Sequence, residues 1–129
     1  MINSLDIGKY VFNLLSTDSS IMEECTRIYP LIADNDAKFP FVTYRRIGLL
    51  SHTCKDGCYE DEVTIEIKVV SDKYSVGLSI ANKIRSLIQV PYRQFTDFEV
   101  NDVTLDFAIE EFIENAFVQT MQFTLKIND

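Results

Sequence analysis

The feature that most constrains the fold is a strict alternation of apolar and polar residues near the middle of the chain. Val or Ile stands at positions 63, 65, 67 and 69, with Thr, Glu and Lys between them. A period of two is that of a β-strand with one buried and one solvated face. The sequence therefore predicts a half-buried strand, and the elements that cover its apolar face must come from elsewhere in the chain.

Two segments have the spacing of amphipathic helices. The first is expected over about residues 4–16, and the second over about residues 72–89, where apolar side chains repeat every three to four positions. Ser71 or Asp72 is a suitable N-cap for the second helix, and Pro91 ends it. These two helices are the predicted cover of the sheet.

Further strands are expected on both sides of the second helix. Residues 27–32 form a short extended segment, which Pro30 confines to a sheet edge, and residues 41–50 form a strand. The polar segment 51–61 is expected to connect that strand to the alternating one as a long hairpin with a turn at Asp56-Gly57.

The C-terminal third returns to a period of two. One strand is predicted to present an inner face of Val103, Leu105, Phe107 and Ile109, and the next alternates from Phe117 to Ile127 with Gln119 as the polar exception. The connection over residues 110–115 is too short for a helix, so the two strands should pair antiparallel. The order α-β-β-β-α-β-β predicts a single α+β domain over residues 1–129, with one mostly antiparallel sheet packed against two amphipathic helices.

The distribution of charge excludes some classes of partner. The 129-residue chain has a formal net charge of −8, and its only adjacent basic pair is Arg45-Arg46. Residues 94–125 contain seven acidic residues and no basic one. Sequence-specific binding of nucleic acid and binding to an anionic membrane are therefore disfavoured, because both depend on clustered Lys and Arg. The N-terminus has no secretory pattern, and the three cysteines are expected to be reduced thiols.

No residue pattern indicates a catalytic or cofactor site. His52 is the single histidine, and no nucleophile motif surrounds it. His52, Cys54 and Cys58 are the one group with metal-ligand chemistry, but a structural zinc site needs four ligands, so we expect loop residues and no bound metal. The four glycines form no phosphate-binding loop, and we expect no cofactor.

Four short segments, in this order, carry a resemblance to a known family. They are Leu14-Leu15-Ser16, Arg27-Ile28-Tyr29-Pro30, Lys38-Phe39-Pro40-Phe41-Val42-Thr43-Tyr44, and Val63 to Val70 leading into a helix with Ala81-Asn82-Lys83-Ile84-Arg85. With these segments the chain resembles the tail completion proteins (tail terminator, head–tail joining) of long-tailed bacteriophages and prophages.

The resemblance implies a non-enzymatic virion protein. Such proteins form a ring of identical subunits, commonly hexameric, which caps the tail tube and contacts the head connector. The implied partners are thus other copies of the chain, the tail tube protein and connector proteins; the implied location is the tail or neck of the virion, after assembly in the bacterial cytoplasm. The candidate contact residues are Arg45, Arg46, His52, Lys55, Asp56, Tyr59, Asp102, Asp106 and Glu110.

Three of these candidates are predicted to form an acidic row on the outer face of one strand. Asp102, Asp106 and Glu110 alternate with its apolar positions. In a ring, the row would face either a central channel, where it would repel passing DNA, or the Arg45, Arg46 or Lys68 side chain of a neighbouring subunit.

Two other classes of function remain open. One is a small-molecule enzyme that uses carboxylates or His52, which would need a pocket around a carboxyl or imidazole group with a perturbed pKa. The other is a host adaptor or an immunity-type binding module, which would share the acidic surface without forming a ring.

Overall fold

The computed structural model describes residues 3–53 and 59–128. Within them it contains a short 3₁₀-helix, three α-helices and six strands. In chain order these are η1 (Ser4–Asp6), α1 (Ile7–Ser16), α2 (Ser19–Glu24), β1 (Arg27–Pro30), β2 (Phe41–Thr53), β3 (Tyr59–Ser71), α3 (Tyr74–Ile88), β4 (Arg93–Phe95), β5 (Phe98–Ile113) and β6 (Ala116–Asn128). The predicted α+β class is confirmed, with one helix (α2) and one strand (β4) more than expected.

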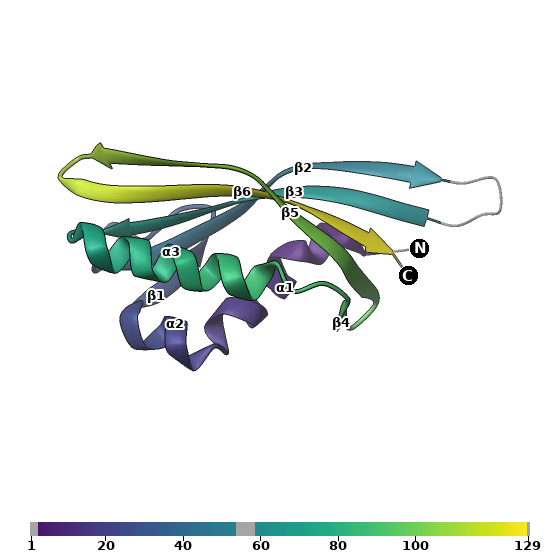
Figure 1. Ribbon diagram of the computed structural model, residues 1–129, viewed down its shortest axis with the longest axis horizontal. Helices are drawn as coiled ribbons and strands as arrows, with labels where there is room; N and C mark the ends of the chain where they lie inside the picture. The colour runs from purple at the N-terminus through teal and green to yellow at the C-terminus, as the bar shows by residue number, and fades with distance from the viewer. Residues whose placement is uncertain (1–2, 54–58, 129) are drawn as a thin grey trace.

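The strands form one sheet in the order β1-β2-β3-β6-β5-β4. All neighbouring strands are antiparallel except β1 and β2, which run parallel, so the sheet is mixed. Figure 1 shows the helices on one side of the sheet. We call this side the helix face and the opposite side the open face. Among the described residues, no helix covers the open face.

The core lies between the helix face and the three α-helices. The predicted alternation of β3 is confirmed, because Val63, Ile65, Ile67 and Val69 are all buried. On β6, Phe123 and Leu125 are buried opposite Ile65 and Val63, and α3 contributes Ile80, Ile84 and Ile88. Each of these side chains stabilises the fold by about 1.5–3 kcal/mol relative to an exposed position.

Local side-chain chemistry sets the ends of two helices. The carboxylate of Asp18 accepts a hydrogen bond from the backbone N–H of Ile21 at 3.0 Å, which caps α2. At α3 the expected N-cap is wrong by one or two residues, because the helix begins at Tyr74 after Lys73. The hydroxyl of Ser71 instead accepts from the N–H of Lys73 at 3.1 Å and orders the turn before the helix.

The predicted inner face of β5 is correct in its first half and wrong in its second. The register with β6 slips between Leu105 and Phe107, so Asp106 is an extra residue in the strand. Such a β-bulge moves every later side chain to the opposite face. Phe107 and Ile109 therefore lie on the open face and are each 48% exposed, whereas Val103 stays buried.

The connection expected over residues 110–115 is mostly strand. β5 continues to Ile113, and only Glu114 and Asn115 form the turn before β6. Both turn residues have positive φ angles, 50° and 63°, which is the geometry of a type I′ hairpin. The β5–β6 hairpin therefore forms one end of the sheet, and the C-terminal end of β2 and the start of β3 lie at the opposite end (Figure 1).

Candidate functional site

The two edge strands of the sheet, β1 and β4, each pair with only part of the neighbouring strand. At one edge, β1 pairs with Phe41 to Tyr44 of β2. At the other edge, β4 pairs with Phe98 to Val100 of β5. Among the described residues, no strand lies beside the remaining parts of β2 and β5. We call residues 45–53 the β2 free edge and residues 102–113 the β5 free edge.

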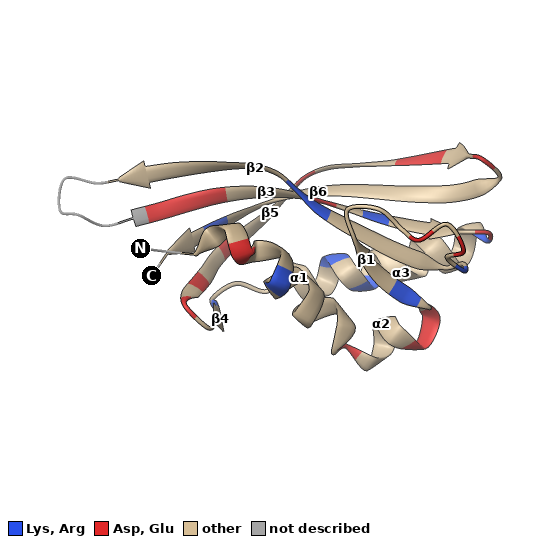
Figure 2. Cartoon of the chain, turned by 180° about the vertical axis from the view of Figure 1, so that it is seen from behind, with Lys and Arg blue, Asp and Glu red and all other residues tan. Residues whose placement is uncertain are grey.

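The two free edges carry opposite charge. The β2 free edge contains Arg45, Arg46 and His52 and no acidic residue. The β5 free edge contains Asp102, Asp106, Glu110 and Glu111 and no basic residue. Figure 2 shows blue in the middle of β2 and red towards the tip of the β5–β6 hairpin, and it also shows a red stretch on β3 beside the outer part of β2, where Glu60, Asp61 and Glu62 lie. Most residues of both edges are exposed, so a partner could reach these charges in addition to the contacts that they make within the chain.

The basic candidates already have partners within the chain. The guanidinium of Arg45 donates to the Glu66 carboxylate at 3.0 Å, and that bond raises the pKa of Arg45. Arg46 donates to the backbone carbonyl of Leu5 at 2.9 Å, which connects β2 to η1. These contacts direct the Arg45 guanidinium over the open face and the Arg46 guanidinium over the helix face.

His52 lies in an open position on the same strand. Its Nε2 atom is 3.8 Å from a carboxylate oxygen of Glu62, and its side chain is 55% exposed. An imidazole in this setting is solvated, and it lines none of the hollows described below.

The predicted acidic row is wrong, because its members lie on both faces of the sheet. Asp102 is in register opposite Lys126, and Asp106 accepts a hydrogen bond from the Thr124 hydroxyl on the open face at 2.6 Å. Glu110 follows the bulge and lies on the helix face, opposite Gln119. The expectation that the three carboxylates face one channel or one neighbour as a row is overturned with it.

Glu110 is held by two hydrogen bonds at the end of the helix face. The Gln119 amide donates to its carboxylate at 2.9 Å, and the Tyr74 hydroxyl donates to the same oxygen at 2.8 Å. The Gln119 bond first, and then the Tyr74 bond, lower the pKa of Glu110. The contact with Glu110 in turn raises the pKa of Tyr74. A carboxylate stabilised in its charged form is a poor general acid at neutral pH.

Lys55 and Asp56 lie outside the described residues, as do Cys54 and Cys58 of the considered metal group. Tyr59 begins β3, opposite Thr53. Within the described part of the chain, no group of three His, Cys, Asp or Glu side chains is placed to hold a metal ion. The remaining cysteine, Cys25, is a buried free thiol, and burial raises its pKa.

The open face has a groove of about 460 Å³. Its floor is formed by side chains of β2, β3 and β6, including Phe41, Lys68 and Val118. One wall is the loop between β1 and β2, and the other is the tip of the β5–β6 hairpin with Glu111 and Ile113. The groove thus combines apolar side chains with the Lys68 ammonium group and the carboxylates of Asp34, Glu111 and Glu114, and its outer wall includes part of the β5 free edge.

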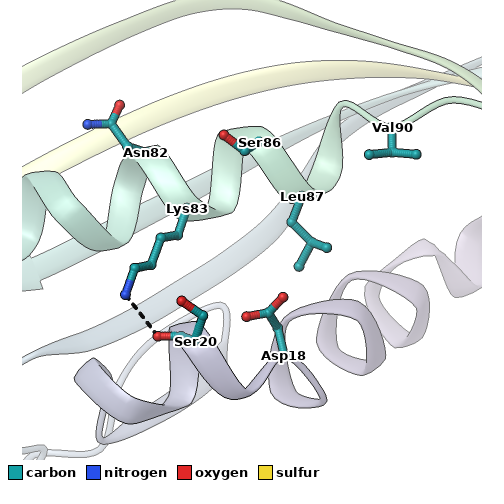
Figure 3. Close-up of a pocket in the computed structure, with 7 residues that line it drawn as sticks. All are labelled: Asp18, Ser20, Asn82, Lys83, Ser86, Leu87 and Val90. Carbon is teal, nitrogen blue, oxygen red and sulfur yellow. Dashed lines mark hydrogen bonds between the residues drawn. The ribbon is translucent and has the colours of Figure 1, made fainter.

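Two further hollows lie on the helical side. One, of about 440 Å³, is shallow and lies between α2 and α3, where the Lys83 ammonium donates to the backbone carbonyl of Ser20 (Figure 3). The other, of about 430 Å³, lies beside β1 and is lined by aromatic and aliphatic side chains together with Arg27. Neither hollow places a nucleophile beside a histidine. Among the described helices, none is long and apolar enough to cross a membrane.

The comparisons with known proteins show the fold. No protein-family model matches the sequence, and no curated protein matches it. Among solved structures, the chain is similar to one from the virion of a native gene transfer agent (GTA) particle. That similarity has a TM-score of 0.80 and covers 92% of each chain at 11% sequence identity.

Sequence reasoning found several of the charged residues of the two free edges but not the edges themselves. Arg45, Arg46 and the acids of β5 stand out by their charge. That the strands lack neighbours depends on how short β1 and β4 are, and β4 is a three-residue strand that no periodicity can reveal. Ile109, an apolar residue of the β5 free edge, was predicted on the inner face and lies on the open face because of the bulge at Asp106.

Proposed function

We propose that this protein is a structural component of a phage-like particle that completes the tail. In this role several copies form a closed ring, with a hexamer expected from the family resemblance. The ring caps the tail tube on one side and presents its other side to the head connector. The protein acts by binding its neighbours, without catalysis.

The observation that carries this proposal is the likeness of nearly the whole chain to one from a gene transfer agent virion. It agrees in kind with the sequence resemblance to tail completion proteins, although the two rest on different data. The opposite charges of the two free edges also support it. A ring needs two different surfaces on each subunit that recognise one another head to tail, and an acidic edge and a basic edge are such a pair.

The proposal is tested by deleting the gene from the phage or prophage that carries it and examining the particles by electron microscopy. We expect filled heads without attached tails, and tails of irregular length, because an uncapped tube continues to grow. Plasmid-borne wild-type protein should restore joined particles. A Lys9→Ala variant, which removes an exposed charge from α1, should restore them equally well and serves as the matched control.

Particles with normally joined tails after the deletion would overturn the proposal. In that case the enzyme and the host adaptor or immunity-type module return as the leading alternatives. Purified protein that stays monomeric at high concentration and does not bind isolated tails would contradict the proposal independently.

A further inference from the structure

We infer that the β2 free edge of one copy pairs with the β5 free edge of the next copy, as neighbouring antiparallel strands of one continuous sheet. The inference rests on the self-association of the proposed function and names the surface through which it occurs. The occupant of each edge is a second copy of this chain, and the contact is made first by backbone hydrogen bonds.

Strand direction permits this pairing. From β2 through β3 and β6 to β5, each neighbouring pair is antiparallel. β2 and β5 therefore run in opposite directions within one copy. When the next copy keeps the same orientation, its β2 arrives antiparallel to β5, and the antiparallel pattern continues across the junction.

The backbone groups of the β2 free edge point outward at known positions. The N–H of Leu31 donates to the carbonyl of Tyr44 at 2.8 Å, so the backbone groups of Tyr44 point away from β3. Alternation places those of Arg46 outward as well, and beyond the register shift near Ile47 the outward residues are Leu49, Ser51 and Thr53. All four of these residues have their side chains on the helix face, since Leu49 stands opposite buried Val63.

The backbone groups of the β5 free edge follow from its hairpin. In a two-residue hairpin the flanking residues, here Ile113 and Ala116, direct their N–H and C=O groups at each other. The outward residues on this part of β5 are therefore Phe112, Glu110 and Ala108. Their side chains also belong to the helix face, because Ala108 stands opposite Met121.

On both free edges the residues whose backbone groups point outward have their side chains on the helix face, and this agreement is the main observation behind the inference. Two strands pair in one sheet only when residues that face each other through their backbone also have side chains on the same side. Both free edges present helix-face residues outward. The next copy can therefore join the sheet with its helices on the same side as those of the first copy.

The lengths of the free edges set the register. β1 ends beside Tyr44, where Leu31 has a positive φ of 65° and the chain turns away from β2. Within the described residues, no strand therefore pairs with the outer side of β2 from Arg45 onward. Placing Phe112 opposite Arg46 pairs β5 of one copy with the unpaired part of β2 of the next copy, up to the point where β1 ends. Glu110 then faces Leu49, and Ala108 faces Ser51. The bulge at Asp106 lies beyond these pairs.

Side chains favour this pairing over the symmetric alternative. On the open face it brings Ile109 opposite Leu50, two exposed apolar residues that would cover each other. It also brings Glu110 and Glu111 close to Arg45 and Arg46. A two-fold pairing of two β5 edges would place acid against acid, which is destabilising for cross-strand neighbours. A head-to-tail arrangement follows, and it closes into a ring when the rotation permits.

The test is a disulfide between the two edges. In a Cys54→Ser/Cys58→Ser background we introduce Ile109→Cys and Leu50→Cys. The pair is predicted to be opposite and not hydrogen-bonded, with Cα atoms about 4.5 Å apart, a distance that a disulfide spans. Mild oxidation should give a ladder of covalent oligomers on a non-reducing gel. A mixture of the two single variants should give dimers and nothing larger.

The matched control is Ile109→Cys with Thr43→Cys. Thr43 belongs to β2 but lies where β1 already occupies the column, so this variant should form no ladder. Light scattering of the unoxidised proteins measures association separately from the position of the contact.

Each outcome decides the inference. A ladder specific to Ile109→Cys/Leu50→Cys supports it. Cross-linked dimers from Ile109→Cys alone would show symmetric pairing and overturn it. Normal oligomers without specific cross-links would overturn it as well and leave the proposed function standing. Monomers in light scattering would contradict both, and the gene deletion then shows whether the proposed function fails independently.

Discussion

Phe107 and Phe123 are residues of one type on neighbouring strands, yet they face different environments. Phe123 is fully buried on the helix face, and Phe107 is 48% exposed on the open face. The extra residue Asp106 causes the difference, because without it Phe107 would continue the inner face that begins with Val103 and Leu105. One inserted residue thus decides which aromatic ring belongs to the core and which to the surface.

We expect the two alanine substitutions to differ accordingly. Phe123→Ala should lower the free energy of unfolding by about 3–5 kcal/mol, because it removes a buried ring and leaves a cavity. Phe107→Ala should lower it by less than about 1 kcal/mol, in the range of ordinary surface changes. Urea denaturation of both variants at low protein concentration, where association does not contribute, checks the prediction. Equal losses would mean that the bulge in β5 is absent in solution.

At the scale of elements, α2 is attached to α3 by an ion pair. The Lys83 ammonium donates to the Glu24 carboxylate at 2.9 Å, and the Ser79 hydroxyl donates to the same oxygen at 3.2 Å. The Lys83 bond is the main cause that lowers the pKa of Glu24 below its ordinary value of 4.5. Figure 3 shows the Lys83 side chain reaching from α3 towards α2, where it also contacts Ser20.

This pair predicts a dependence of stability on pH. A carboxylate whose pKa is lower in the folded state adds stability above its ordinary pKa, and that stability is lost as the pH falls through the folded value. Lys83→Met should therefore lower stability at pH 7, by less than about 1 kcal/mol for a partly exposed pair. The difference from the parent protein should shrink below pH 4.5.

Thermal melts from neutral to acidic pH measure this difference. Lys38→Met, which removes the same charge from the loop before β2, is the control and should show no such narrowing. If the Lys83→Met variant remained less stable than the parent by the same amount down to acidic pH, the lost stability would come from packing of the lysine stem and not from the ion pair.

The elements that sequence predicts best are those with a long, unbroken period. The β3 strand and the α3 helix extend over many positions, so one irregular residue does not hide them. The second half of β5 was assigned to the wrong face because apolar residues alternate before and after Asp106, and each half alone is a correct strand pattern. The Glu114-Asn115 turn was missed because it lacks the glycine usual in such hairpins. The candidate site was predicted least well, because whether a strand edge is free depends on its neighbouring strands and not on a residue pattern.

At the scale of the whole molecule, the separation of charge between the two free edges predicts how assembly responds to salt. Opposite charges near the surface attract less as the Debye length falls. Raising NaCl from about 0.05 M to about 0.5 M should weaken self-association by about tenfold. Sedimentation or light scattering over a protein dilution series measures the change.

Glu111→Gln/Asp106→Asn should weaken association at low salt and reduce its salt dependence, because the acidic edge loses two charges. Glu99→Gln, a change of the same type on a part of β5 that β4 already covers, is the matched control and should behave like the parent. Association that strengthens with salt would instead point to a contact between exposed apolar side chains, such as Leu50 and Ile109, as the main source of affinity.

The shortness of β1 and β4 also has a consequence for the dimensions of the assembly. In the inferred pairing, β1 and β4 fall in columns that neighbouring copies also occupy, so each copy adds the width of only four strands. At about 4.8 Å per strand this is about 19 Å per copy, measured perpendicular to the strands. The inferred register also shifts each copy by about six residues, or about 20 Å, along the strands, so in a closed ring the strands must be tilted by about 45° from the ring axis. Each copy then adds about 28 Å of perimeter, and six copies would enclose a circle about 53 Å across at the backbone. The bore of the ring would then change only in whole-subunit steps, so the diameter measured in an electron micrograph counts the subunits.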